Sequence, residues 1–169
     1  MTPNEIFKRL GLHGAPLDRK AKSVKDGPPD KLITIFEHHF GITLPAEYLD
    51  LLRFHNGGTP KRRIFRLKNV PAGYTLEDGY SIGIFYYLDD DRDGFNNLWT
   101  VTERFRPFIG KTGLPIAEDV SGDVIFIETK TGQVQYATHE VNFEKAVVAD
   151  SFLELLAALE YDPEDEPQS

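Results

Sequence analysis

The sequence predicts an α+β fold: a single domain with a mostly antiparallel, curved sheet and flanking helices. Helical periodicity occupies the first third of the chain, segments rich in β-branched and aromatic residues follow, and a capped helix comes last. The regular alternation of strands and helices that marks a doubly wound sheet is absent. With 169 residues, 40% of them hydrophobic, the chain can bury one sizeable core, and neither an internal repeat nor a second domain is visible.

Three helices are predicted in the first third. Residues 3–11 place Ile6, Phe7 and Leu10 on one side, and 13–30, rich in Pro, Gly and Lys, is a predicted loop. A second helix over 31–40 follows Asp30, a residue type favoured at N-caps. Its predicted inward face comprises Leu32, Ile35, Phe36 and His39.

A third helix is predicted over 45–55, because Pro45 suits a first helical position and apolar residues then recur with helical spacing. Its predicted shared face comprises Leu44, Tyr48, Leu51, Leu52 and His55. The helix stops at Asn56-Gly57-Gly58, where glycine can take the left-handed conformation that ends helices.

The remaining elements follow from strand and capping signals. The predicted strands are 62–67, 80–88, 123–129, 133–140 and 146–149. A helix over 95–105 would bury Leu98, Trp99, Thr102 and Phe105. Ser151 and Glu154 form a capping box for a last helix, whose predicted buried face comprises Phe152, Leu155, Leu156 and Leu159. We therefore expect one domain over 1–160, with a variable loop at 12–30 and an acidic disordered tail at 161–169.

Charge is unevenly divided along the chain. Residues 1–75 hold 13 Lys/Arg and 7 Asp/Glu, whereas 76–169 hold 6 Lys/Arg and 20 Asp/Glu, within a net charge of −8. The acidic half argues against non-specific nucleic-acid binding and permits a basic protein partner, although ordinary solubility also explains it. There is no cysteine, no apolar run of membrane-spanning length and no signal-peptide core. A cytoplasmic protein without membrane contact is expected.

The segment "DDDRDG" at 89–94 is the part of the sequence that most resembles a metal-binding site. Asp89, Asp91 and Asp93 match the first three ligand positions of an EF-hand calcium loop. The match then fails, because the position that needs a bidentate glutamate is Thr100, and the preceding segment is a predicted strand rather than a helix. A solvated acidic loop is favoured over a weak cation site.

No other segment supplies catalytic chemistry. The nucleophile-elbow, phosphate-loop and dinucleotide motifs are absent, and the histidines do not share metal-binding spacing. "PKRRIFRLK" at 60–68 is basic with interleaved aromatics, but a strand that places its charges on one face explains it better than RNA binding does. We expect no enzymatic activity, no cofactor and no bound metal.

Two short blocks, in order and followed by the closing helix, resemble the SUKH superfamily over roughly residues 30–160. The first block comprises Leu44, Pro45, Tyr48, Asn56, Gly57 and Gly58. The second comprises Pro115, Ile116, Ala117, Asp119, Gly122 and Asp123. That group includes bacterial toxin-immunity proteins and fungal regulators of cell-wall synthesis. A tryptophan that the family often carries in a helix has no equivalent here, since Trp99 lies elsewhere.

The resemblance implies a non-catalytic domain that binds a protein. The leading hypothesis is an immunity protein that neutralises a cognate toxin, such as a nuclease with a basic surface, and the alternative is a regulatory scaffold for an endogenous protein. The Asn-Gly-Gly turn is then expected to have a structural role, ending the helix, rather than a role in binding or catalysis. The predicted partner-binding residues are Asp89, Asp90, Asp91, Asp93, Tyr86, Tyr87 and Trp99, although the three aromatic residues could equally belong to the core.

Overall fold

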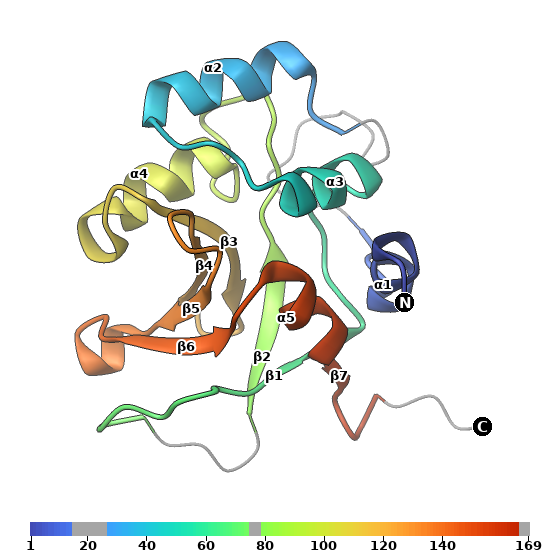
Figure 1. Cartoon of the computed structure of the whole chain (residues 1–169), viewed down its shortest axis with the longest axis vertical. Coiled ribbons are helices and arrows are strands. Elements are labelled where there is room, and N and C mark those ends of the chain that lie inside the picture. The colour runs from blue at the N-terminus through green and yellow to red at the C-terminus, as the bar shows by residue number, and fades with distance from the viewer. Residues whose placement is uncertain (15–26, 75–78, 166–169) are drawn as a thin grey trace.

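All neighbouring strands of the sheet run antiparallel, in the order β6-β5-β4-β3-β2-β1-β7. The computed structural model describes residues 1–14, 27–74 and 79–165. The strands are β1 (Arg62–Phe65), β2 (Tyr80–Phe85), β3 (Gly113–Asp119), β4 (Val124–Glu128), β5 (Val134–Ala137), β6 (Lys145–Ala149) and β7 (Glu160–Tyr161). With the flanking helices they confirm the predicted α+β class (Figure 1).

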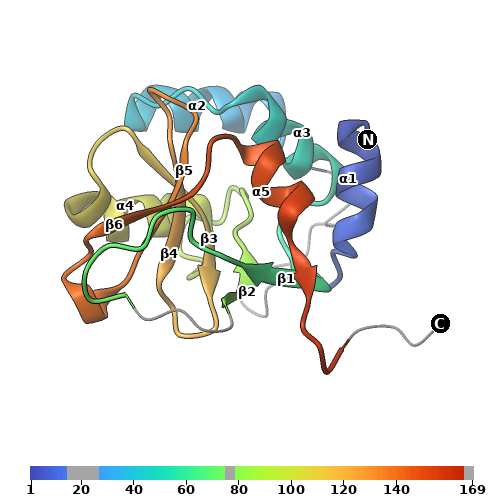
Figure 2. The ribbon, with the colours of Figure 1, turned by 60° about the horizontal axis from the view of Figure 1, so that its bottom comes forward.

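The sheet curls into a half-barrel. The chain that follows β1 crosses towards β6, the far strand of the sheet, as Figure 2 shows. There the Lys68 amide donates to the Val147 carbonyl at 2.7 Å. The Lys68 ammonium also contacts Asp150 and Glu154 at the start of the last helix. These contacts hold the two ends of the curl together.

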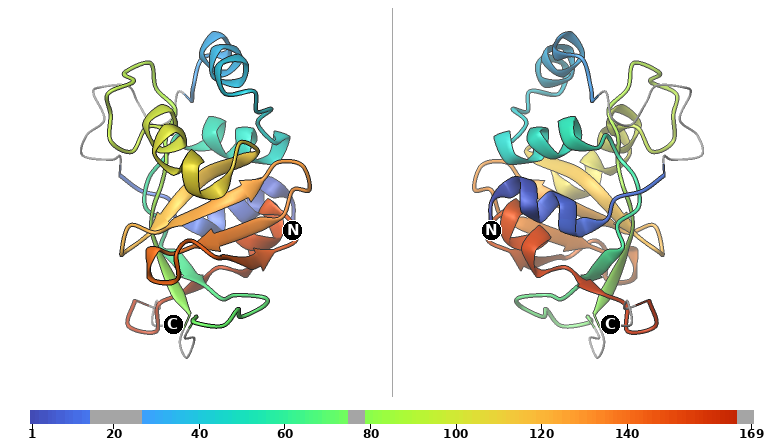
Figure 3. Two further views of the ribbon diagram at one scale, coloured as in Figure 1. Left: turned by 90° about the vertical axis from the view of Figure 1, so that its left-hand side faces the viewer. Right: turned by 90° about the vertical axis from the view of Figure 1, so that its right-hand side faces the viewer.

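Helices lie on the flanks of the sheet. They are α1 (Pro3–Leu10), α2 (Asp30–Phe40), α3 (Ala46–Phe54), α4 (Leu98–Ile109) and α5 (Phe152–Ala158), with a short 3₁₀ turn η1 (His139–Val141). Helix α4 packs on β3, while α1, α3 and α5 contact one another (Figure 3). The ring of Tyr48 on α3 lies 5.5 Å from that of Phe152 on α5, at nearly a right angle. Edge-to-face pairs of this kind add specificity to the buried area.

Helix starts follow the predicted capping pattern with two exceptions. Ser151 accepts a hydrogen bond from the Glu154 amide at 3.1 Å, although the Glu154 carboxylate reaches Lys68 instead of closing the predicted box. Helix α2 is one exception, because Pro29 occupies its N-cap and Asp30 is its first residue. Helix α3 is the other, because Pro45 occupies its N-cap rather than its first position. An acidic residue in the first turn still interacts favourably with the helix dipole.

The buried face of α2 differs from the prediction. Ile33 and Phe40 are buried there, whereas Ile35 and His39 are exposed. The physical reason is the position of Trp99 on α4, whose ring meets the Phe40 ring at 5.3 Å and so sets which side of α2 faces inward. His39 covers the same indole from the outside, at 5.1 Å.

Strands β3 and β7 are absent from the strands predicted from the sequence. In β3 the run Leu114 to Ala117 is buried without alternation, and Pro115 lies where the register with β4 shifts. Continuous burial and an internal proline both hide a strand from pattern reasoning. Strand β7 has only two residues, which pair with β1 at the point where the predicted tail begins.

The predicted variable segments are only partly described. Residues 15–26 of the loop and 166–169 of the tail lie outside the described residues. The placed tail residues Asp162 and Asp165 both contact the Arg63 guanidinium. Across the described ranges, the helices are too short or too polar to cross a lipid bilayer.

Candidate functional site

The Asn56-Gly57-Gly58 turn fastens the end of α3 to the chain beyond β2. The Asn56 side chain donates to the Leu88 carbonyl and accepts from the Leu88 amide, both at 2.9 Å. Gly57 has a φ of +84°, and a side chain there would lie 2.8 Å from Cβ of Tyr87. Because all three residues are buried, the turn has a packing role and offers no surface to a partner.

The three aromatic residues predicted as anchors are buried. Tyr86, Tyr87 and Trp99 are each 3% exposed or less. Trp99 packs edge-on against Phe36 at 5.4 Å, within the contact between α2 and α4. In this conformation the three rings belong to the core, the alternative that the sequence left open, and no partner can reach their faces.

The four predicted aspartates divide by exposure. Asp89 is only 4% exposed, Asp91 is half-buried, and Asp90 and Asp93 are exposed. The loop backbone is organised by Asn97, whose side-chain amide donates to the carbonyls of Asp89 and Asp91 at 2.9 and 2.8 Å. A neutral amide therefore holds the acidic loop, which we call the Asp loop (residues 89–97).

Two arginines accompany the Asp loop, and the sequence analysis overlooked both. Arg92 lies over the Trp99 ring at 4.1 Å, and Arg104 lies over the Phe95 ring at 3.9 Å. Phe95 is 60% exposed even so. An exposed aromatic ring beside an arginine is typical of residues that dominate binding at protein interfaces. The sequence did contain a signal for this site, because Phe95 is an apolar residue within a strongly charged segment.

A second acidic centre lies at the turn between β3 and β4. Asp119 is 5% exposed and accepts hydrogen bonds from the amides of Ser121 and Asp123, both at 2.9 Å, and from the Tyr136 hydroxyl. Asp123, also 5% exposed, accepts from the Thr138 hydroxyl at 2.7 Å. We call this arrangement the buried Asp pair (Asp119 and Asp123).

His139 completes the arrangement from η1. Its ring Nδ1 lies 2.7 Å from Asp123 Oδ1, and its amide donates to the same oxygen at 3.1 Å. The hydrogen bond and charge of Asp123 raise the pKa of the His139 imidazole above its ordinary value of 6.5. Burial raises the pKa of Tyr136, and the hydrogen bond to Asp119 raises it further. The direction of the His139 shift indicates a negative local potential, whereas that of Tyr136 reflects burial first.

A small cavity of about 110 Å³ opens beside the buried Asp pair. Its wall comprises Gly73, Tyr74, Tyr80, Asp119, Ser121, Asp123, Tyr136, Thr138 and Glu140. Resemblance to the family pointed to Asp119, Gly122 and Asp123 in this turn, but not to the tyrosines or to Glu140. Their approach depends on how β2, β3 and β5 are paired, which no local sequence signal specifies.

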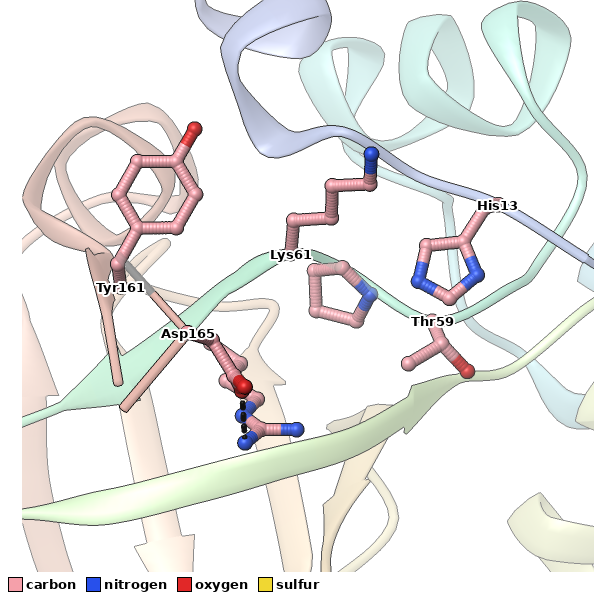
Figure 4. Close-up of a pocket in the computed structure, with 7 residues that line it drawn as sticks. His13, Thr59, Lys61, Tyr161 and Asp165 are labelled. Carbon is pink, nitrogen blue, oxygen red and sulfur yellow. Dashed lines mark hydrogen bonds and ion pairs between the residues drawn. The ribbon is translucent and has the colours of Figure 1, made fainter. Parts of the chain in front are cut away.

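A larger cavity of about 450 Å³ lies between the first loop, the start of β1 and the tail. Figure 4 shows its labelled lining residues His13, Thr59, Lys61, Tyr161 and Asp165, with a dashed line where Asp165 meets Arg63. These ion-pair partners are 32% and 55% exposed, and such pairs contribute little to stability. The cavity could accept an anionic group, in competition with the chain's own acidic tail.

Metal binding finds no support in the side chains that the structure places. Within the described ranges, no three histidine, aspartate or glutamate side chains gather as metal ligands. At the Asp loop, Asp89 and Asp91 instead cap backbone amides two residues ahead, at 3.3 and 3.4 Å. Such turns are ordinary loop geometry for aspartate.

Most of the chain matches a known protein family. A family model described as SMI1 / KNR4 family (SUKH-1) matches residues 27–158. Among curated proteins none is significantly similar to the chain. The matched span covers most of the chain and contains the Asn-Gly-Gly turn, the Asp loop and the buried Asp pair.

Proposed function

The chain belongs to the SMI1/KNR4 (SUKH-1) family, and from this premise we propose that it is an immunity protein that binds and neutralises a cognate bacterial toxin. Family membership is the observation that carries the proposal. SUKH domains are protein-interaction modules, and the group includes immunity proteins. In this role the domain works in the cytoplasm, by covering the toxin's functional surface rather than by catalysis.

The charge distribution supports a toxin with a basic surface. The excess of 20 acidic over 6 basic residues in 76–169 includes both the Asp loop and the buried Asp pair. Complementary charge speeds the encounter of two proteins and disfavours wrong partners. Nucleases carry basic surfaces because they bind phosphates, so a nuclease toxin fits the proposal.

The Asp loop supplies the best-suited exposed surface. Asp90 and Asp93 are exposed there, and Phe95 adds an accessible ring with Arg104 lying over it. Aromatic and arginine side chains anchor interfaces, while surrounding charges set association rate and specificity. We propose that these residues face the toxin, in place of the buried Tyr86, Tyr87 and Trp99.

Co-expression tests the proposal directly. The toxin-like domain encoded by the open reading frame beside the gene is expressed with and without this chain, and growth is measured. We expect growth arrest by the toxin domain alone and rescue by the chain. A catalytically inactivated toxin domain provides the control for expression burden.

Two outcomes contradict the proposal. If an active neighbouring toxin still arrests growth in the presence of the folded chain, the chain is not its immunity protein. If the neighbouring reading frames encode no toxin-like domain, the regulatory scaffold becomes the better explanation.

A further inference from the structure

The cavity beside the buried Asp pair has the size of one side-chain end. Its volume of about 110 Å³ far exceeds the roughly 10–15 Å³ that a single water needs. It is also well below the roughly 300 Å³ at which small-molecule pockets begin. A drug-sized molecule is therefore too large for this space, whereas the end of one extended side chain from another protein fits it.

The charge within the cavity wall is unbalanced. Asp119 is 5% exposed, yet its contacts in the described part of the chain come from neutral donors: two backbone amides and the Tyr136 hydroxyl. Asp123 has His139 as its only described cationic partner, and Glu140 adds a third carboxylate to the wall. Buried carboxylates are normally neutralised by a paired cation. Among the described residues, the wall supplies acceptors and negative charge without a matching lysine or arginine.

Three tyrosines also line the cavity. The Tyr80 and Tyr136 rings are 4.8 Å apart at their centroids, and the Tyr74 ring lies 6.1 Å from Tyr136. The faces of tyrosine rings attract cations, and guanidinium stacks on them particularly well because it is planar. Tyr74 and Tyr136 are buried, so Tyr80 is the ring that a cation can reach, and its position beside the carboxylates makes a site for a guanidinium group.

We propose that this cavity receives a single arginine side chain from the protein partner. The guanidinium would donate hydrogen bonds to the remaining acceptor positions of Asp119 and Asp123 and lie beside the partly exposed ring of Tyr80. The identity of the partner rests on the proposed function, but the affinity of the cavity for guanidinium does not. The site lies at the β3–β4 turn, apart in sequence and in the sheet from the Asp loop that follows β2.

Titration of the full chain with a small arginine probe tests the site without any toxin. Nα-acetyl-arginine amide is added to ¹⁵N-labelled protein, and amide chemical shifts are followed by NMR. The amides of Ser121, Asp123 and His139 report directly, because each donates to one of the two buried carboxylates. We expect saturable shifts at these amides in the millimolar range. Nα-acetyl-citrulline amide, the neutral isostere, should produce none.

Three variants distinguish binding of the probe in the cavity from a general effect of the protein's negative charge. Glu140→Gln removes an exposed charge from the cavity wall without touching the buried Asp pair, and should weaken the probe by about threefold or more. Asp119→Asn should weaken it by about tenfold, the loss expected for one charge-assisted contact. Glu103→Gln makes the matched change on the exposed face of α4 and should leave the affinity unchanged.

Each outcome of these experiments either supports or overturns the arginine site. Equal shifts with citrulline, an absence of saturation, or unchanged affinity in Glu140→Gln would each overturn the arginine site. If Asp119→Asn does not fold, Glu140→Gln still decides. If the toxin is neutralised equally well by Glu140→Gln and by the parent, and the probe does not bind, the cavity inference fails while the proposed function stands.

Discussion

Two acidic turns flank β2, and they use their carboxylates in opposite ways. The Asp loop follows the end of β2, exposes Asp90 and Asp93, and has Arg92 and Arg104 on neighbouring rings. The buried Asp pair lies beside the first half of β2, where Asp119 pairs with Ile82 across the sheet. Its carboxylates are only 5% exposed and organise the turn through hydrogen bonds.

The difference shows that the number of acidic residues is a poor guide to what they do. Four aspartates within five positions drew attention to the Asp loop, although exposed charges act mainly at long range and are screened by salt. The two separated aspartates of the β3–β4 turn are weaker as a sequence signal. Their burial makes each of their contacts stronger and more costly to remove.

Removing one carboxylate from each region should produce the largest contrast. Asp119→Ala leaves the Tyr136 hydroxyl and two backbone amides without their acceptor, so we expect a loss of about 3 kcal/mol in the free energy of unfolding. Asp93→Ala, in the exposed loop, should change it by less than about 0.5 kcal/mol. Urea unfolding measures both, and equal effects would abolish the distinction between the two turns.

The conformation of the Asp loop depends on the side chain of Asn97. Asn97 donates to two loop carbonyls and accepts from the Trp99 amide at the start of α4. Asn97→Ala should therefore destabilise the protein by about 2 kcal/mol, through loss of a helix cap and of buried hydrogen bonds. The exposed Asn69 provides a matched control for thermal unfolding. A stability change no larger than that of Asn69→Ala would mean that the acidic side chains themselves order the loop.

The exposed carboxylates of the Asp loop should matter for association rather than for stability. Replacing Asp90, Asp91 and Asp93 with asparagine removes charge, nearly preserves shape and spares the buried Asp89. If the loop faces a basic toxin, association at low ionic strength should slow by about tenfold, with a smaller effect at high salt. Stopped-flow or surface-based kinetics with the toxin domain would measure the rate.

A charge-matched control distinguishes the effect of the Asp loop on the association rate from the effect of the protein's overall charge. Glu47→Gln, Asp50→Asn and Glu103→Gln together remove the same charge from exposed positions elsewhere. This control should alter the rate much less than the loop variant does. Equal slowing by both variants would exclude the Asp loop from the interface and leave only diffuse charge steering.

The smallest expected effect is the pH response of the His139–Asp123 pair. Because Asp123 raises the pKa of His139 above 6.5, folding favours the protonated imidazole. The extra stability is therefore fully present below pH 6.5 and is lost as pH rises through the folded-state pKa. Glu140 and Asp119 act in the same direction as Asp123. The difference in melting temperature between the parent and His139→Gln should shrink as pH rises, and a difference that grows would reverse the sign of the coupling.

Sequence reasoning succeeded where the signal is local. Helical spacing and capping signals located the five α-helices of the described residues and the buried residues of α1, because apolar side chains recur on one face of neighbouring turns. The helix predicted over 95–105 is displaced, since α4 spans Leu98–Ile109. It failed for Ile35 and His39 on α2, where the inward side depends on Trp99 from a distant helix. It failed for β3 because a strand buried on both faces has no alternating pattern.

The candidate sites were predicted less completely than the fold. Tyr86 and Tyr87 are adjacent, so a strand with one solvent-facing side would expose one of them, yet both are buried where the chain leaves β2. Phe95 was overlooked although it is the exposed ring of the same loop. The contact between Asp119 and Tyr136 joins strands that are not neighbours in the sheet, so it follows from the curl and not from any motif.

Calorimetric titration of the full chain with the toxin domain encoded beside its gene tests the central claim most directly. We predict a one-to-one complex with submicromolar affinity that weakens as salt is added, since complementary charge contributes to binding. An enzymatically active, folded toxin domain that gives no binding heat at any temperature tried, and leaves the melting temperature of the chain unchanged, would contradict the immunity function.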